Sequence, residues 1–269
     1  MRRFLLAAAV FGLASGAQAA DMPDFLRGSL PGVSSPQNWQ GFYLGAQGGY
    51  GSSDENFNGS TANMTQALLA NTLIEESMQV SQWNLGLGKN SARSSGYGAF
   101  TGYNSQWDDV VLGLEASYLH GGFGGSTSAS EARNSLLSDN LYHNVTATST
   151  SAISISDMAT FRGRAGYAFG SFLPYLFGGL ALGNADISRS ILVQDSVSPT
   201  YLGNYTKLQP LSATDAVHNH LIYGYTAGLG VDINLIGGLF MRAEWEYVRF
   251  TSAVDTSINT VRAGLGYKF

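Results

Sequence analysis

The sequence predicts an all-β fold, namely an eight-stranded antiparallel transmembrane β-barrel with short periplasmic turns and long outer loops. Three observations support this prediction: the alternation within the last segment, its recurrence along the chain, and the pattern of connection lengths. Successive side chains of an extended strand face opposite sides of a sheet. In residues 259–269 one face is apolar and the other carries Arg262 and Lys268, as a strand between lipid and a polar lumen requires. The apolar face consists of Val261, Ala263, Leu265, Tyr267 and Phe269.

Eight alternating segments follow one another, each close to the length of about 9–11 residues that a tilted transmembrane strand needs. The fifth is apolar on both faces, so its facing stays open, and the first two alternate weakly. Aromatic residues at segment ends suit the interfacial girdles of a barrel; they are Trp39, Phe42, Tyr50, Trp107, Tyr118, Phe169, Trp245, Tyr247 and Phe269. The segments cover approximately residues 40–51, 95–106, 110–121, 154–169, 172–187, 221–234, 238–250 and 257–269.

The connections alternate in length, with short turns at residues 107–109, 170–171 and 235–237. Long outer loops are predicted at residues 52–94, 122–153 and 188–220, with a shorter one at 251–256. Short periplasmic turns and long outer loops around an even number of strands are typical of outer-membrane barrels. In the first long loop, residues 64–70 and 73–78 allow a short amphipathic helix over the barrel mouth, or a mobile loop.

The amino-terminus predicts export. Arg2 and Arg3 precede an apolar run and an Ala-Gln-Ala site, the pattern of a secretory signal peptide. We expect a signal peptide over residues 1–19, cleaved after Ala19 or Ala20. A proline-containing flexible periplasmic lead-in is expected over residues 20–38, and the transmembrane barrel over residues 39–269.

Net charge, cysteine content and motifs together argue against several classes of function. The formal net charge of −5 argues against nucleic acid as a partner, because nucleic-acid binding needs a basic surface. The chain has no cysteine, which leaves it without disulfides and thiolate chemistry. No motif indicates a cofactor: the glycine-rich stretches do not match phosphate-binding loops.

The inward faces of the predicted strands collect charged side chains of both signs. Eight strands leave a lumen that side chains just fill, so these groups are expected to pair in a structural salt-bridge core. The alternative is a charged constriction that lines a small pore. The predicted lumen charge network comprises Glu115, Arg162, Arg164, Asp232, Arg242, Glu244, Glu246, Arg262 and Lys268.

Histidines suggest two further sites, both weakly. His120 ends the third segment at the outer rim, where a catalytic base of a barrel enzyme would lie, but no Gly-x-Ser-x-Gly elbow is present. His218 and His220 would share a side of an extended segment, which permits weak metal binding. A solvated loop pair is the better interpretation, and we predict no metal site and no enzyme.

Several motifs together resemble a known family, the small porin-like outer-membrane β-barrel proteins of alphaproteobacteria, akin to the barrel of outer-membrane protein A. The motifs are Trp39-Gln-Gly-Phe-Tyr-Leu-Gly-Ala-Gln-Gly-Gly-Tyr50, Gly102-Tyr-Asn104, Phe161-Arg-Gly-Arg-Ala-Gly-Tyr167, Pro174-Tyr175 and the closing residues 260–269. The resemblance implies integral outer-membrane localisation, with outer-membrane lipids and lipopolysaccharide as partners. It also implies insertion by the barrel-assembly machinery, which would recognise the terminal strand through Val261, Leu265, Tyr267 and Phe269.

The expected function is a structural role in the envelope, with limited passive diffusion of small solutes left open. The alternative is a surface receptor or adhesin that acts through the long outer loops, whose ligand the sequence does not identify. A barrel enzyme acting on outer-membrane lipids is a third hypothesis.

Overall fold

The computed structural model describes residues 38–83, 85–251 and 254–269. The predicted signal peptide and the lead-in up to residue 37 lie outside the described residues. No helix among the described residues is long and apolar enough to span a membrane.

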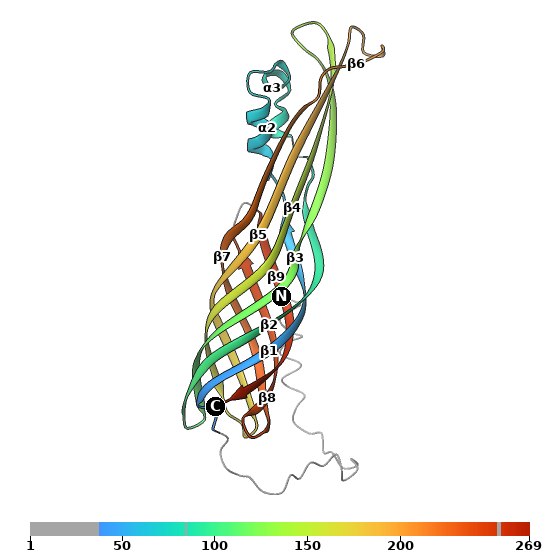
Figure 1. Cartoon of the computed structure of the whole chain (residues 1–269). Coiled ribbons are helices and arrows are strands. Elements are labelled where there is room, and N and C mark those ends of the chain that lie inside the picture. The colour runs from blue at the N-terminus through green and yellow to red at the C-terminus, as the bar shows by residue number, and fades with distance from the viewer. Residues whose placement is uncertain (1–37, 84, 252–253) are drawn as a thin grey trace, which may run out of the picture. The chain divides into compact units, whose positions relative to one another are not determined.

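Eight antiparallel strands form a closed ring, so the predicted fold class is confirmed (Figure 1). Neighbouring strands pair in the order β4-β3-β2-β1-β9-β8-β7-β5, and pairing between β4 and β5 closes the ring. A two-residue strand, β6, pairs only with the end of β5 and is not part of the ring. The strands are β1 (Gly41–Asn56), β2 (Lys89–Trp107), β3 (Val110–Leu136), β4 (Tyr142–Tyr167), β5 (Phe172–Ser198), β6 (Thr206–Lys207), β7 (Leu211–Ile236), β8 (Leu239–Phe250) and β9 (Asp255–Lys268).

The two faces of the ring differ as the sequence predicts. In β3, Leu114 is 75% exposed on the outside while its neighbour Glu115 is buried inside. The predicted facing of the third, fourth, sixth, seventh and last segments is confirmed by the same alternation. The fifth strand turns Leu176 and Leu180 outward and Tyr175 and Phe177 inward. An apolar outer surface around a closed ring is what contact with lipid requires.

The prediction that Trp39 belongs to the interfacial girdle is wrong. It is buried inside the barrel and packs edge-on against Phe240, so it belongs to the interior. Phe42, Trp107 and Phe269 are exposed near the end of the ring that carries the short turns, as an interfacial girdle requires.

The predicted long outer loops are largely wrong, because four strands continue far past the others (Figure 1). We call this part the extension: residues 123–136 of β3, 142–155 of β4, 187–198 of β5 and 211–217 of β7. Its ladder runs from Phe123 opposite Ile155 to Leu136 opposite Tyr142, and from Tyr142 opposite Ser198 along β5. Serine and threonine, which made these stretches look like loops, form cross-strand hydrogen bonds such as Ser128 Oγ to Thr150 Oγ1 at 2.9 Å.

A row of β-bulges separates the ring from the extension. The register shifts between His120 and Phe123 in the β3–β4 pair and between Ile155 and Asp157 in the β4–β5 pair. A third shift lies between Ala185 and Ile187, opposite residues 217–220 of β7. Bulges bend a strand and increase its twist locally, so this row is where the barrel wall changes direction.

The first predicted loop is instead a helical insertion between β1 and β2. It contains α2 (Ala62–Leu68), α3 (Leu73–Met78) and a 3₁₀ turn, η1 (Val80–Gln82), so helices form where the sequence allowed one. The side chain of Thr72 accepts a hydrogen bond from the Glu75 amide and so caps α3. The insertion buries Leu69, Ile74 and Trp83 against Val145 and Ile191 of the extension.

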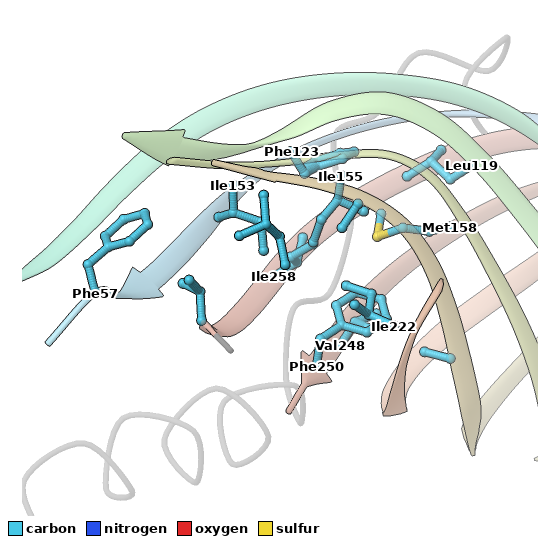
Figure 2. Close-up of a cluster of buried hydrophobic side chains, with 14 of the residues drawn as sticks. Phe57, Leu119, Phe123, Ile153, Ile155, Met158, Ile222, Val248, Phe250 and Ile258 are labelled. Atoms are coloured by element: carbon cyan, nitrogen blue, oxygen red, sulfur yellow. The ribbon is translucent and has the colours of Figure 1, made fainter. Parts of the chain in front are cut away.

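Two further apolar clusters lie inside, one within the ring and one where the ring meets the extension. The lower cluster lies at the end with the short turns and is mainly aromatic: Trp39, Tyr43, Phe100, Val111, Ala168, Leu173, Tyr175, Phe177 and Phe240. The upper cluster gathers side chains of several strands, among them Phe123, Ile155 and Phe250, which are drawn together in Figure 2. Between these two clusters the interior is polar.

Candidate functional site

The inward charges of the sequence prediction lie together in the polar layer. Alternation brings Glu115 of β3 opposite Arg162 of β4, and Asp232 of β7 opposite Arg242 of β8. Each of these two carboxylates therefore faces a guanidinium directly across a strand pair. The eight members that come together are all at most 4% exposed: Glu115, Arg162, Arg164, Asp232, Arg242, Glu244, Glu246 and Arg262.

Arg242 links two of the carboxylates. Its Nε and Nη2 donate to the two oxygens of Asp232 at 2.7 and 2.9 Å, a bidentate pair. Its Nη1 donates to Glu115 Oε2 at 2.7 Å. Arg164 approaches the same carboxylates, with Nη2 at 2.7 Å from Asp232 Oδ2 and Nη1 at 3.2 Å from Glu115 Oε2. Such planar, charge-assisted pairs hold both partners in one geometry.

Arg162 joins three carboxylates across the lumen. Its Nε donates to Glu115 Oε1 at 2.9 Å, and its Nη2 lies 2.8 Å from both oxygens of Glu244. Its Nη1 reaches Glu246 Oε1 at 3.2 Å. Arg262 forms an ion pair with Glu246 and also donates to Thr260 Oγ1. The eight groups thus form one network with four acids and four bases, which is formally neutral.

Aromatic side chains complete the network, and the sequence analysis missed them. Tyr43 donates to Glu115 Oε2 at 2.7 Å and Tyr175 donates to Glu244 Oε1 at 2.6 Å. Arg164 stacks 3.7 Å from the ring centroid of Tyr175, and Arg242 stacks 3.9 Å from that of Phe100. Burial strengthens such cation–π contacts. Knowing which face of the fifth segment points inward would have identified Tyr175. Because both faces of this segment are apolar, the sequence does not show which one that is.

Lys268 does not lie in this network. Its Nζ donates to the backbone carbonyls of Asn38 and Gln40, at 2.6 and 3.3 Å. Lys268 lies on the inward face of β9, as predicted. However, it follows Arg262 by six residues, which is about 20 Å along a strand at ~3.3 Å per residue. The side chain is too short to cross that distance, so it pairs with carbonyls at the strand end.

The predicted assembly residues occupy the outer face of β9. Val261, Leu265, Tyr267 and Phe269 are 64%, 54%, 51% and 75% exposed. Strand β9 pairs with β1 from Lys268 opposite Tyr43 to Asp255 opposite Asn56, so the last strand of the chain lies beside the first. The amide of Phe269 donates to the carbonyl of Phe42 at 2.9 Å.

The histidine candidates form pairs with carboxylates. His120 Nδ1 lies 2.8 Å from Asp157 Oδ1 on the outer surface beside the bulge row, and Tyr118 donates to the same oxygen at 2.5 Å. Ser156 donates to Asp157 rather than to the histidine. His218 is strongly exposed and lies 3.5 Å from Asp186. Within the described parts of the chain, no three His, Cys, Asp or Glu side chains are grouped to hold a metal ion.

A family model described as outer membrane protein beta-barrel domain matches residues 5–269. The chain belongs to this family. It is an integral β-barrel protein of the bacterial outer membrane, as the sequence motifs indicated.

Two relatives of the chain are also described as outer-membrane proteins. The chain is 25% identical over 195 residues to the 25 kDa outer-membrane immunogenic protein of Brucella ovis, covering 69% of this chain and 74% of the relative. It is 25% identical over 249 residues to the 22 kDa outer membrane protein of Rhizobium leguminosarum bv. viciae, covering 88% and 81%. Among solved structures, Neisserial surface protein A aligns over 87% of this chain and 100% of its own, at 15% identity and a TM-score of 0.34. A score this low adds nothing to the assignment.

Proposed function

We propose that this outer-membrane protein is a closed structural barrel that does not conduct solutes, and that it holds the extension outside the cell. The observation that carries the proposal is the filled interior. A neutral network of eight buried charges lies between the lower and the upper apolar cluster. A barrel of eight strands has an interior that side chains can fill, which leaves no continuous path for water. The filled interior favours the structural role over passive diffusion.

Conductance in planar bilayers tests this proposal. We expect no steady single-channel conductance from the refolded full chain. Removing one whole ion pair in the double variant Glu115→Ala and Arg162→Ala keeps the network neutral while it takes two large side chains out of the lumen. We expect no conductance in this variant either, because the lower and upper apolar clusters still close the lumen on both sides of the network. The variant should instead unfold at a lower urea concentration than Arg249→Ala, which truncates an exposed arginine of β8. Steady conductance of the unmodified chain would contradict the proposal.

A second candidate function, attachment to a partner outside the cell, is favoured by the tip of the extension. In the turn after β5, Tyr201 is 59% exposed and Leu202 is 92% exposed. Apolar and aromatic side chains at an exposed tip are typical anchors of interaction surfaces. Attachment of cells that display the protein to a eukaryotic cell monolayer would be compared between the natural chain and Leu202→Ser. Loss of attachment, with unchanged heat-modifiable migration in gels, would support this function; equal attachment would contradict it.

We also infer that the protein is not an enzyme. Support comes from the surroundings of His120, whose hydrogen bond within the described residues goes to a carboxylate and not to a serine nucleophile. A nucleophile and its base need to be within hydrogen-bond reach. Outer-membrane lipid composition should therefore be the same in cells that express the natural chain and His120→Ala. A change in lipid turnover that depends on His120 would overturn this inference.

A further inference from the structure

Strand β3 forms one edge of the extension (Figure 1). Its pairing with β2 ends where Gly96 lies opposite Gly121, whereas its pairing with β4 continues to Leu136. Three side-chain contacts still tie the first part of this edge to β2 and the insertion. They are Ser94 Oγ to the carbonyl of Gly122, Asn90 Nδ2 to that of Ser126 at 3.2 Å, and Thr127 Oγ1 to that of Leu87 at 3.0 Å.

The open part of the edge runs from Ser128 to Leu136. Among the described residues, the backbone of this segment pairs only with β4. In an antiparallel ladder, alternate residues turn their N–H and C=O groups away from the neighbouring strand. Such a free row of donors and acceptors is a template on which a further strand can pair.

Side chains along this segment leave its backbone accessible. The outward residues Ser128, Ser130, Ala132 and Asn134 have short side chains, and all four are exposed. The segment contains neither proline nor lysine, which commonly block edge strands. An added strand therefore meets no large or charged side chain on the outward face.

Two charged residues on the inward face select the partner. Glu131 and Arg133 flank Ala132 symmetrically, and within one copy Arg133 Nε donates to Glu131 Oε1 at 2.7 Å. If two copies of the segment pair antiparallel about Ala132, each Glu131 lies directly opposite Arg133 of the other copy. Opposite charges that face each other across a strand pair are stabilising, and like charges are destabilising. The edge is thus complementary to itself.

Strand direction determines where the second copy lies. In all copies within one membrane, β3 runs outward from the short turn before Val110, so a symmetric pair of them would be parallel and would bring Glu131 beside Glu131. Antiparallel pairing needs a second copy that points the opposite way, as in a facing membrane. Ala132 lies nine residues beyond Phe123 of the bulge row, about 30 Å along the strand at ~3.3 Å per residue, so the two bulge rows would be at most about 60 Å apart.

We propose that the β3 edge from Ser128 to Leu136 pairs antiparallel with the same edge of a second copy in a facing membrane, and so joins two cells. The paired segments are short, so a contact between two single chains is weak. Many copies on each surface act together, and this multivalency strengthens the junction. The inference rests on the proposed position of the extension outside the cell.

Clustering of phosphatidylcholine vesicles that carry the refolded full chain tests the proposal, with turbidity and dynamic light scattering as readouts. We expect vesicles with the natural chain to cluster and vesicles without protein to stay apart. Glu131→Arg alone, or Arg133→Glu alone, should abolish clustering, because all four facing charges then have one sign. When vesicles with Glu131→Arg are mixed with vesicles with Arg133→Glu, clustering should return, because every base again faces an acid. Heat-modifiable gel migration checks that both variants are folded.

A charge reversal elsewhere and a cross-link complete the test. Lys207→Glu, in the exposed strand β6, should leave clustering unchanged. The chain has no cysteine, so Ala132→Cys can form a disulfide only between copies. Two vesicle populations with different affinity tags should then give dimers that contain both tags. Thr148→Cys, in β4 between β3 and β5, should give none.

Three results would overturn the proposal: no clustering by the natural chain, unchanged clustering by the two single charge variants, or no recovery on mixing them. The edge would then be left for a strand of a different protein. Because the clustering assay does not measure conductance, its failure would leave the proposed closed barrel standing.

Discussion

Replacing Arg242 with alanine should destabilise the barrel strongly. Arg242 is 1% exposed and holds Asp232 through two hydrogen bonds and Glu115 through one. The variant leaves the network with four acids and three bases. The freed oxygens stay buried, because the upper and lower apolar clusters separate them from water.

Removing one partner of a buried ion pair costs about 3–5 kcal/mol, because the remaining charge keeps its desolvation penalty. We expect the free energy of unfolding of Arg242→Ala to fall by an amount in this range. The loss should not be larger, because Arg164 still contacts Asp232 and Arg162 still contacts Glu115. In a soluble domain of this size, each kcal/mol would lower the thermal midpoint by about 2–4 °C, or about 6–20 °C in all. Glu244→Ala should behave similarly, because it leaves Arg162 with fewer partners.

Urea-induced unfolding from lipid vesicles, followed by tryptophan fluorescence and by heat-modifiable gel migration, measures the effect. Arg249→Ala is the matched control, since Arg249 lies on the same strand but is exposed on the outside. The double variant Arg242→Ala and Asp232→Ala restores neutrality, so its loss should be smaller than the sum of the two single losses. If Arg242→Ala unfolds at the same urea concentration as Arg249→Ala, the network is not a packed core and the reasoning fails.

Three further predictions concern assembly, packing and pH. Deletion of Phe269 should impair insertion in cells, measured as the folded fraction in outer-membrane preparations; normal insertion would argue against its role as an assembly signal. Gly179→Val should cost about 1–3 kcal/mol of stability in urea unfolding, because a Cβ there would collide with the carbonyl oxygen of Phe161. In the extension, burial lowers the pKa of His143, but the hydrogen bonds to Asp139 and Asp195 and the negative charges of these two groups together raise it by more, so the net shift is upward. This contribution to stability is fully present below the unfolded pKa of about 6.5 and is lost as pH rises through the higher folded pKa. Hydrogen exchange of β4 amides, corrected for intrinsic rates, should therefore show more opening at alkaline than at mildly acidic pH, and His143→Gln should remove the difference.

The eight strands and their facing could be predicted because lipid outside and a packed polar layer inside impose opposite demands on alternate residues. Arg162 and Arg164 stand two positions apart between outward Phe161, Gly163 and Ala165, which fixes their direction without any knowledge of the partners. Pairing across strands is harder to predict, since it depends on the register. That Arg162 reaches Glu244 and Glu246 on the opposite wall follows only from closure of the ring.

Local sequence could not reveal the extension or the inner side of β5. Residues 142–151 are rich in serine and threonine, which suggest a loop when each stretch is judged by polarity alone. Their strand structure depends on neighbours distant in the chain, because β4 pairs with β3 on one side and with β5 on the other. In β5, Tyr175 and Leu176 are both apolar enough for lipid, and only the network partners of Tyr175 decide its direction.

The bulge row explains how the same alternation of apolar and polar residues fits both the part of the barrel in lipid and the part in water. Along β4, apolar residues recur at odd positions, from Val145 to Tyr167. Below the bulge at Ser156 the odd residues, such as Phe161, face outward to lipid; above it, residues such as Val145 face inward to the helical insertion. One extra residue reverses the facing of every following side chain in a strand. The same reversal occurs in β7, where Tyr223 is exposed outside the ring but Leu211 packs against the insertion. Because the apolar side changes from outside to inside at this row, the row marks where the surroundings of the barrel change from lipid to water.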